Sequence, residues 1–343
     1  MIDWGVFQIH VGDCRASMRQ LAAKGVRAQC CITSPPYFGL RDYGRPGQIG
    51  LEKTPEEYVC ALVEAFECVR ELLADDGVLW LNLGDSYAGG GQNSGSTAAD
   101  LTAKQRSNAG CRYERLAVPA GLKPKDLIGI PWRVALALQA AGWYLRQDII
   151  WHKPNPMPES VTDRCTKAHE YLFLLTKTSR YVWNRGAMQE PCVGVNTHDV
   201  TGGAVHAPGQ TPQGTRRSGN RARKPASARG VPVDTGGHPS GAVAGSVPWE
   251  GFTRNKRSVW TVPTRPYRGA HFATFPRRLI EPCVLATSRP GDLVLDPFAG
   301  SGTVGESAVC NGRRAILCDL NDEYANLMLH RIVEAALGGG LIA

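Results

Sequence analysis

The residues best suited to chemistry form a short run, Ser34-Pro35-Pro36-Tyr37, which Thr33 separates from the apolar stretch Cys30–Ile32. The apolar stretch predicts a buried strand, and the two prolines end it because they lack a backbone N–H group and fix φ. The carbonyl groups of this rigid corner are left free to accept hydrogen bonds, and an aromatic ring follows at once. Such a corner suits the binding of a flat base that carries an amino group, although a proline-rich turn with a buried tyrosine would have the same residues.

A second run with chemical potential is Gly291–Thr303, GDLVLDPFAGSGT. A short apolar strand ends in an acidic residue, and a glycine-rich turn then enters a predicted helix, Val304–Cys310, where a nucleotide-like ligand can approach the backbone. The run matches neither G-x-G-x-x-G nor G-x-x-x-x-G-K-[ST], which disfavours a pyrophosphate or a nucleoside triphosphate. Asp319 follows the next predicted strand, Ala315–Cys318, and could accept hydrogen bonds from both hydroxyls of a ribose. The pattern predicts a site for an adenosine whose substituent is not a phosphate.

Elements predicted from apolar periodicity surround both runs. The expected strands are Phe7–Val11, Ala28–Thr33, Val78–Leu83, Trp143–Trp151 and His169–Thr176, and the expected helices are Cys14–Ala23, Pro55–Leu73, Lys125–Ala141 and Arg277–Ala286. Thr54 and Pro55 are typical of a helix start, since threonine is a good N-cap and proline is favoured in the first turn.

The composition is that of a soluble globular protein with a basic surplus. The 343 residues carry a net charge of +8, with a pI near 9.0, which favours a polyanionic partner. Eleven cysteines are scattered without a C-x-x-C pair, which indicates reduced thiols in a reducing compartment and no metal site. The start of the chain is not a signal peptide, and Pro131 and Arg133 interrupt the most apolar long stretch, so no membrane segment is expected.

Two segments have the composition of loops. Gly89–Leu122 is polar and rich in glycine, and Gly186–Thr253 is dominated by Gly, Pro, Ser, Thr and Arg. The second contains a basic run without acidic neighbours: Arg216, Arg217, Arg221, Arg223, Lys224 and Arg229. A solvated linker would have this composition too, but a nucleic-acid-contacting insertion fits the flanking motifs better.

These motifs carry a family resemblance. TSPPY ahead of DPFAGSGT, with HFATFP (His271–Pro276) just upstream of the latter, resembles the amino-methylating DNA methyltransferases of the beta, circularly permuted class. The resemblance covers Gln8–Thr178 and Ser258–Val333. The longer segments TSPPYFGLRDYG, LNLGDSY, GLKPKDLIGIPWR and KPNPMPESVTDR further resemble a phage- and prophage-borne subset of that class.

The resemblance implies a fold, a division of the chain and a cofactor. The fold is an α/β, doubly wound, mostly parallel Rossmann-like methyltransferase sheet with helices on both faces and loop-rich insertions. Residues 1–185 form the catalytic half of the core, residues 186–255 a basic insertion in the place of the target-recognition region, and residues 256–343 the cofactor-binding half. The composition of the insertion departs from that of a typical folded recognition domain. The implied cofactor is S-adenosyl-L-methionine, and the implied partner is double-stranded DNA.

The resemblance also assigns roles to individual residues. Ser34, Pro35, Pro36 and Tyr37 match the catalytic motif, in which the serine and a proline carbonyl hold the target amine and the tyrosine stacks on an extruded base. The residues that match cofactor-binding positions are Asp13, Phe275, Asp296, Pro297, Phe298, Ala299, Gly300, Ser301, Gly302, Thr303 and Asp319. Among them Asp319 matches the acid that binds the ribose.

The sequence leaves more than one possibility for the target base and for the class of substrate. In the family, a serine at the head of the catalytic motif favours cytosine-N4 methylation, and adenine-N6 methylation is the alternative. Methylation at carbon-5 of cytosine needs a cysteine nucleophile, and neither Pro191-Cys192 nor Pro282-Cys283 stands in the catalytic corner. An RNA or protein amine methyltransferase and a catalytically inactive DNA-binding protein are further alternatives on the same scaffold.

The resemblance also bears on the cellular setting. It places the protein in the cytoplasm of a prokaryotic or phage-infected cell, associated with the nucleoid. It leaves open a homodimer and a restriction endonuclease partner in a restriction-modification system.

The basic run generates a prediction about DNA affinity. Replacing all six residues of that run, five arginines and one lysine, with Gln should weaken binding to every DNA sequence and flatten its salt dependence, because fewer counterions are released from the phosphates. Affinity for S-adenosylmethionine should stay unchanged, since the core lies outside the run. The measurement is DNA affinity against salt concentration for both proteins, and an unchanged slope would identify the run as a solvated linker.

Overall fold

The structure is a computed structural model that describes residues 1–89, 118–191, 253–264 and 275–338. The chain divides into two compact units, Met1–Gln189 with Asn255–Ala343, and Glu190–Arg254. The first unit contains both chemical motifs and the main sheet. Of the second unit only the ends are described, where β7 (Gln189–Pro191) and β8 (Thr253–Asn255) pair in a two-stranded sheet.

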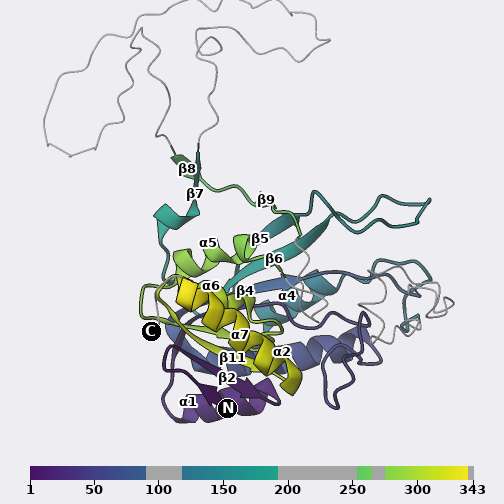
Figure 1. The fold of residues 1–343 in the computed structure, drawn as a ribbon. Helices are drawn as coiled ribbons and strands as arrows, with labels where there is room; N and C mark the ends of the chain where they lie inside the picture. Colours follow the sequence, from purple (N-terminus) through teal and green to yellow (C-terminus); the bar gives the residue numbers. More distant parts are fainter. Residues whose placement is uncertain (90–117, 192–252, 265–274, 339–343) are drawn as a thin grey trace, which may run out of the picture. The chain divides into compact units, whose positions relative to one another are not determined.

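A nine-stranded sheet forms the centre of the first unit, in the order β1-β2-β11-β10-β3-β4-β6-β5-β9 (Figure 1). The strands are β1 (Ile2–Asp3), β2 (Phe7–Val11), β3 (Ala28–Thr33), β4 (Leu73–Leu83), β5 (Tyr144–His152), β6 (His169–Thr176), β9 (Val259–Thr261), β10 (Leu293–Asp296) and β11 (Arg314–Asp319). Within this described sheet only β1 and β6 run against the others. The mostly parallel sheet predicted from the sequence is confirmed.

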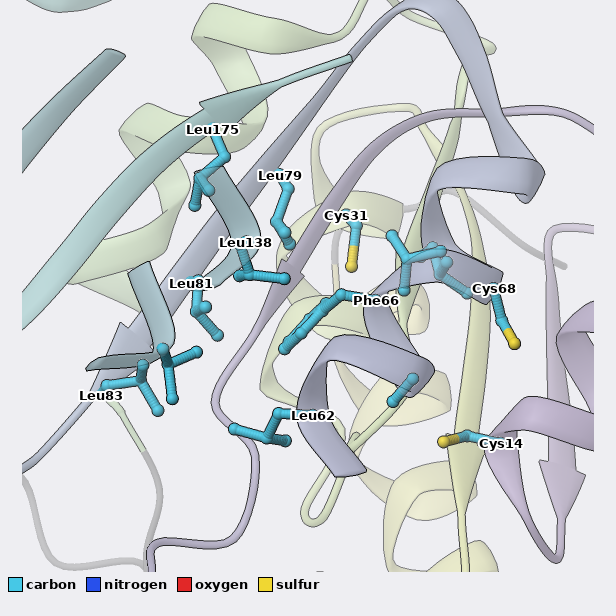
Figure 2. Packing of buried hydrophobic residues seen from close by; sticks show 14 of the residues in the cluster. Cys14, Cys31, Leu62, Phe66, Cys68, Leu79, Leu81, Leu83, Leu138 and Leu175 are labelled. Carbon is cyan, nitrogen blue, oxygen red and sulfur yellow. The ribbon is translucent and has the colours of Figure 1, made fainter. Parts of the chain in front are cut away.

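Helices cover both faces of the sheet. They are α1 (Cys14–Ala23), α2 (Pro55–Leu72), α4 (Ile130–Ala140), α5 (Arg277–Thr287), α6 (Thr303–Cys310) and α7 (Asp322–Gly338), with a 3-10 turn at Arg185–Met188. Successive strand residues point to opposite faces, so Cys31 joins the core under α1, α2 and α4, while Cys30 and Ile32 join the core under α5, α6 and α7. Figure 2 shows the first of these cores, where Phe66 of α2 and Leu138 of α4 lie near Leu79 of β4.

The starts of α2 and α4 are fixed in different ways, one by neighbouring residues and the other by a residue far away in the sequence. At the start of α2, the Thr54 hydroxyl accepts from the Glu57 N–H at 3.1 Å, and Pro55 occupies the first turn, as the sequence predicts. The predicted helix Lys125–Ala141 begins only at Ile130. Asp85 Oδ1 accepts from the backbone N–H groups of Gly129, at 3.0 Å, and Ile130, at 3.1 Å. Asp85 therefore caps the start of α4, although it is remote from that helix in the sequence.

No helix in the described ranges is long and apolar enough to cross a membrane.

Candidate active site

The two motifs singled out in the sequence leave the sheet side by side. β3 and β10 are parallel neighbours, and the Thr33 hydroxyl at the end of β3 donates to Asp296 Oδ1 at the end of β10, at 2.6 Å. Both side chains are buried, with 0% and 2% of their surface exposed. The corner that starts at Ser34 and the turn that starts at Pro297 therefore emerge from one edge of the sheet, where parallel α/β folds bind ligands.

Asp296 is a structural link in this arrangement. Burial raises the pKa of its carboxyl to about 7, against the hydrogen bonds from Thr33 and from the Phe298 N–H, and the nearby charge of Asp319 raises the pKa further. Its Oδ1 atom accepts both of these hydrogen bonds. The sequence proposed Asp296 as a cofactor residue, and the structure places its carboxyl between the two motifs.

Two glycines and Asp319 shape the turn after β10. Gly300 and Gly302 have φ of +52° and +79°, in the left-handed region that favours glycine. The Gly300 N–H donates to Asp319 Oδ2 at 2.8 Å, and the Asn321 N–H donates to Asp319 Oδ1 at 2.8 Å. Burial raises the pKa of Asp319, while these two backbone bonds lower it. A carboxylate has about four lone-pair sites, so Asp319 keeps acceptor capacity on both oxygens.

Several other residues of the turn are engaged inside the protein. The Ser301 hydroxyl accepts from Arg331 Nη1 at 2.7 Å, and Pro297, Ala299 and Thr303 are buried. Phe298 is half-buried, with its ring 6.4 Å from that of Phe66. The side chains that can still face a ligand here are Phe298 and Asp319, and the other turn residues offer mainly backbone.

Asp13 and Phe275 lie on different segments of the chain. Gly12 donates its N–H to the Asp319 carbonyl at 2.9 Å, which brings the segment before α1 to the same strand end. Asp13 caps α1 by accepting from the Arg15 N–H at 2.8 Å, and hydrogen bonds from the Arg15 side chain hold the pKa of its carboxyl below the usual range. Phe275 is half-buried and packs with the core under α5, α6 and α7, whereas Phe298 packs with the core of the other face.

Tyr37 of the catalytic corner is held by residues of β4, of the segment just after β4, and of β6. The Tyr37 ring lies against Gly84, where an added Cβ would come within 2.5 Å of Tyr37 Cε2. The Tyr37 hydroxyl donates to Glu170 Oε2 at 2.7 Å and to Asn82 Oδ1 at 3.2 Å, and it accepts from Ser34 Oγ at 3.3 Å. Tyr37 thus packs through its ring and forms hydrogen bonds through its hydroxyl.

The two proline carbonyls of the corner differ. The Tyr58 hydroxyl donates to the Pro36 carbonyl at 2.8 Å, whereas no described residue donates to the Pro35 carbonyl. The Pro35 carbonyl and Ser34 Oγ therefore keep acceptor capacity in the corner.

Sequence reasoning missed several of these residues. Glu170 is the one charged residue in an otherwise apolar strand, EYLFLL, and that isolation was a usable signal. Arg45 gave no such signal, yet it ties the loop after the corner to the start of α7, through Asn321 Oδ1 at 2.6 Å and Asp322 Oδ1 at 2.8 Å. This clamp joins the catalytic corner to the residues next to Asp319.

Some predicted residues lie outside the described residues. These are the basic run at Arg216, Arg217, Arg221, Arg223, Lys224 and Arg229, and most of HFATFP ahead of Phe275. In the part of the chain that the structure describes, no group of three or more His, Cys, Asp or Glu side chains could hold a metal ion.

Two cavities lie elsewhere in the first unit. One of about 550 Å³ is lined by Asp76, Arg180–Asn184, Ser288–Pro290 and Arg313, and so lies where β10 and β11 begin. The other, of about 280 Å³, is lined by Trp80, Trp183, Trp260 and neighbouring polar residues. Neither of these two cavities includes a residue of the corner or of the glycine turn.

Comparison with known proteins agrees with this geometry. A family model described as DNA methylase, of the N6 and N4 type, matches residues 28–330. Type II methyltransferase M.Cfr9I of Citrobacter freundii is 42% identical over 321 residues, which cover 94% of this chain and 86% of the relative. Type II methyltransferase M.SmaI of Serratia marcescens is 42% identical over 328 residues, which cover 95% and 90%.

Solved structures show the same fold at low sequence identity. The chain matches the PvuII DNA methyltransferase, titled cytosine-N4-specific, with a TM-score of 0.56 and 15% identity over 98% of this chain and 93% of that one. It matches TTHA0409 of Thermus thermophilus, solved with S-adenosyl-L-methionine, with a TM-score of 0.54 and 21% identity over 97% and 96%.

The buried Asp296 predicts a pH-dependent stability. Because its pKa is raised to about 7 from 3.8, the folded chain binds more protons than the unfolded chain between these values, and the free energy of unfolding falls as the pH rises through that window. From pH 5 to pH 8 the loss from this group is on the order of 2–3 kcal/mol.

Asp296→Asn provides the matched comparison, since its Oδ1 can still accept from Thr33 and Phe298 but the group does not titrate. Urea unfolding at pH 5 and pH 8 should show wild type losing stability relative to this variant. Parallel pH profiles for the two proteins would contradict the assignment.

Proposed function

The chain belongs to the N6 and N4 DNA methylase family, and we propose that it methylates the N4 amine of cytosine in double-stranded DNA, with S-adenosylmethionine as the methyl donor. The observation that supports this most is the junction of β3 and β10. The Thr33–Asp296 hydrogen bond links an acceptor corner for an amine to a glycine turn, and the Gly300 N–H of that turn donates to Asp319, the proposed ribose-binding acid. The family places DNA ahead of RNA or protein as the substrate.

The residues around Asp319 fit the adenosine part of S-adenosylmethionine. Asp319 keeps free lone pairs on both carboxylate oxygens for the two ribose hydroxyls, and the left-handed Gly300 and Gly302 let a ligand approach the backbone. The half-buried Phe298 lies in the same turn. When bound, the cofactor supplies an electrophilic methyl group on a positively charged sulfur.

The corner activates an amine that is a poor nucleophile because its lone pair is delocalised into the ring of the base. Ser34 Oγ and the Pro35 carbonyl accept its two N–H groups, which favours a pyramidal nitrogen and stabilises the positive charge that develops on it. The Pro35 carbonyl suits this role because no described residue donates to it. Fixing the amine at the end of β3 also aligns it with the neighbouring strand end, where the methyl donor binds.

The base must leave the duplex to reach this corner. Stacking on the Tyr37 ring offsets part of the cost of unstacking, and the absence of a side chain at Gly84 leaves room for that ring. The basic run of the second unit is proposed to contact phosphates. A homodimer, a restriction endonuclease partner, the circularly permuted class and the phage subset stay predictions.

Cytosine is favoured over adenine by the serine at the head of the motif. A carboxylate or amide in that position would pull more strongly on the amine, and it is the pattern associated with adenine-N6 methylation. Adenine-N6 is therefore the second candidate.

Nucleoside mass spectrometry tests the function and the target base together. DNA from cells that express the chain should contain N4-methylcytosine, and DNA from cells that express Tyr37→Ala should contain little, because about 1–3 kcal/mol of stacking is lost. N6-methyladenine in its place would assign the second candidate, and no modified base in wild-type cells would refute the proposal. Purified Tyr37→Ala should keep its affinity for S-adenosylmethionine, and an equal loss of that affinity would make the corner structural.

Asp319 provides a separate prediction for cofactor binding. Asp319→Ala should weaken the binding of S-adenosylmethionine by about 1.5–3 kcal/mol, because two hydrogen bonds to a charged acceptor are lost. Calorimetry is the measurement. Asp292→Ala is a suitable control, because Asp292 caps a turn at the opposite end of β10, where it accepts from the Arg289 N–H at 2.7 Å. Unchanged affinity in Asp319→Ala would remove Asp319 from the site.

A further inference from the structure

The corner contains a chain of hydrogen bonds whose direction matters for the reaction. Ser34 can assist an amine only if its oxygen presents a lone pair, because both amine hydrogens are donors. A serine hydroxyl can equally present its proton, so something must fix its rotation. We infer that Glu170 fixes it, through Tyr37, and that Glu170 is a positioning residue for methyl transfer. This inference rests on the proposed function and deepens it.

Glu170 is held as an acceptor by Lys153. The Lys153 ammonium pairs with Glu170 Oε1, and only 18% and 15% of the two side chains is exposed. An ammonium group can only donate, so Glu170 Oε1 is the acceptor in this pair. Lys153 is itself placed over the ring of the buried Trp151, with its Nζ atom 4.3 Å from the ring centre. The remaining oxygen of Glu170, Oε2, faces the Tyr37 hydroxyl at 2.7 Å.

Asn82 adds a second acceptor facing the same hydroxyl. Its Nδ2 group donates to the Tyr171 carbonyl at 3.0 Å, and this bond turns Oδ1 toward the Tyr37 hydroxyl at 3.2 Å. Asn82 is buried, with 2% of its surface exposed, so its amide has little freedom to turn. Both neighbours of the Tyr37 hydroxyl on this side therefore accept.

These two acceptors fix the direction of the hydrogen bond between Ser34 and Tyr37. The single proton of the Tyr37 hydroxyl must point to this side, mainly toward Glu170, at 2.7 Å, with Asn82 as the longer, second acceptor at 3.2 Å. Burial, reinforced by the charge of Glu170, raises the pKa of Tyr37, so it keeps this proton. Its oxygen is then the acceptor for the Ser34 hydroxyl, at 3.3 Å. Because the Ser34 hydroxyl donates its proton to Tyr37, only its lone pairs can face the target amine.

Glu170→Gln tests this directly because the change is nearly isosteric. Since Lys153 only donates, the glutamine oxygen should face Lys153 and its NH2 group should face Tyr37. That N–H then competes with Ser34 for the tyrosine oxygen, and the serine proton is released toward the amine. We expect kcat for methyl transfer from labelled S-adenosylmethionine to unmethylated plasmid DNA to fall by about 10- to 100-fold. Affinities for DNA and cofactor should stay unchanged, since neither depends on this direction.

Tyr37→Phe removes the link while keeping the ring for stacking. It should also lower kcat at unchanged DNA affinity, and adding Glu170→Gln to it should cause no further loss, because Glu170 then has no route to Ser34. The matched control is Glu281→Gln, another half-buried glutamate in an ion pair, with Arg277 at 2.7 Å on α5. It should leave kcat unchanged.

The outcomes distinguish the positioning role of Glu170 from the proposed methyltransferase function. Full activity in Glu170→Gln or in Tyr37→Phe would overturn the positioning role and leave the proposed function intact. Losses that multiply in the double variant would overturn it as well, since Glu170 would then act by another route. Should Glu170→Gln fail to fold, the activity of Tyr37→Phe still decides the matter. A wild-type chain that methylates no DNA would overturn both claims.

Discussion

The site depends on one register, that of β3 against β10. Val294 pairs with Cys30 and Leu295 with Cys31, so the next residues of both strands reach the sheet edge together and Thr33 can donate to Asp296. Neighbouring strands lie about 4.8 Å apart, which fixes the spacing between an amine held after β3 and a cofactor held after β10. A slip of one residue would turn every side chain to the wrong face. The alternation of Cys30, Cys31 and Ile32 between the two cores therefore protects the geometry of the site.

Around this junction, several residues of the catalytic corner and the glycine turn stabilise the backbone of the site. Ser301 is bound by Arg331, Asp296 by Thr33, and Gly302 leaves room for Met328, whose Cγ atom would be 3.0 Å from an added Cβ. The groups that we propose to contact the base and the cofactor are few: Ser34, the Pro35 carbonyl, the Tyr37 ring and Asp319. Residues outside the motifs set how these few groups are oriented.

The sequence was sufficient for local features and insufficient for distant ones. Short apolar runs followed by Ser34 and by Pro297 predicted both strands and both turns, because a strand end next to prolines or glycines is a local property. The start of α4 could not be predicted, since its cap, Asp85, comes from a loop far from it in the sequence. Glu170 was missed for the same reason, because it meets Tyr37 only after β6 has paired beside β4. The order of strands in the sheet likewise has no local signal.

The central claim is that the ends of β3 and β10 form a single site for amine and cofactor. The most direct measurement is a crystal structure of the chain with S-adenosylhomocysteine. The ribose hydroxyls should lie on the Asp319 carboxylate, and the sulfur should face the Ser34 hydroxyl and the Pro35 carbonyl. Binding at another place, such as the cavity lined by Asp76 and Arg313, or a sulfur directed away from the corner, would contradict the account.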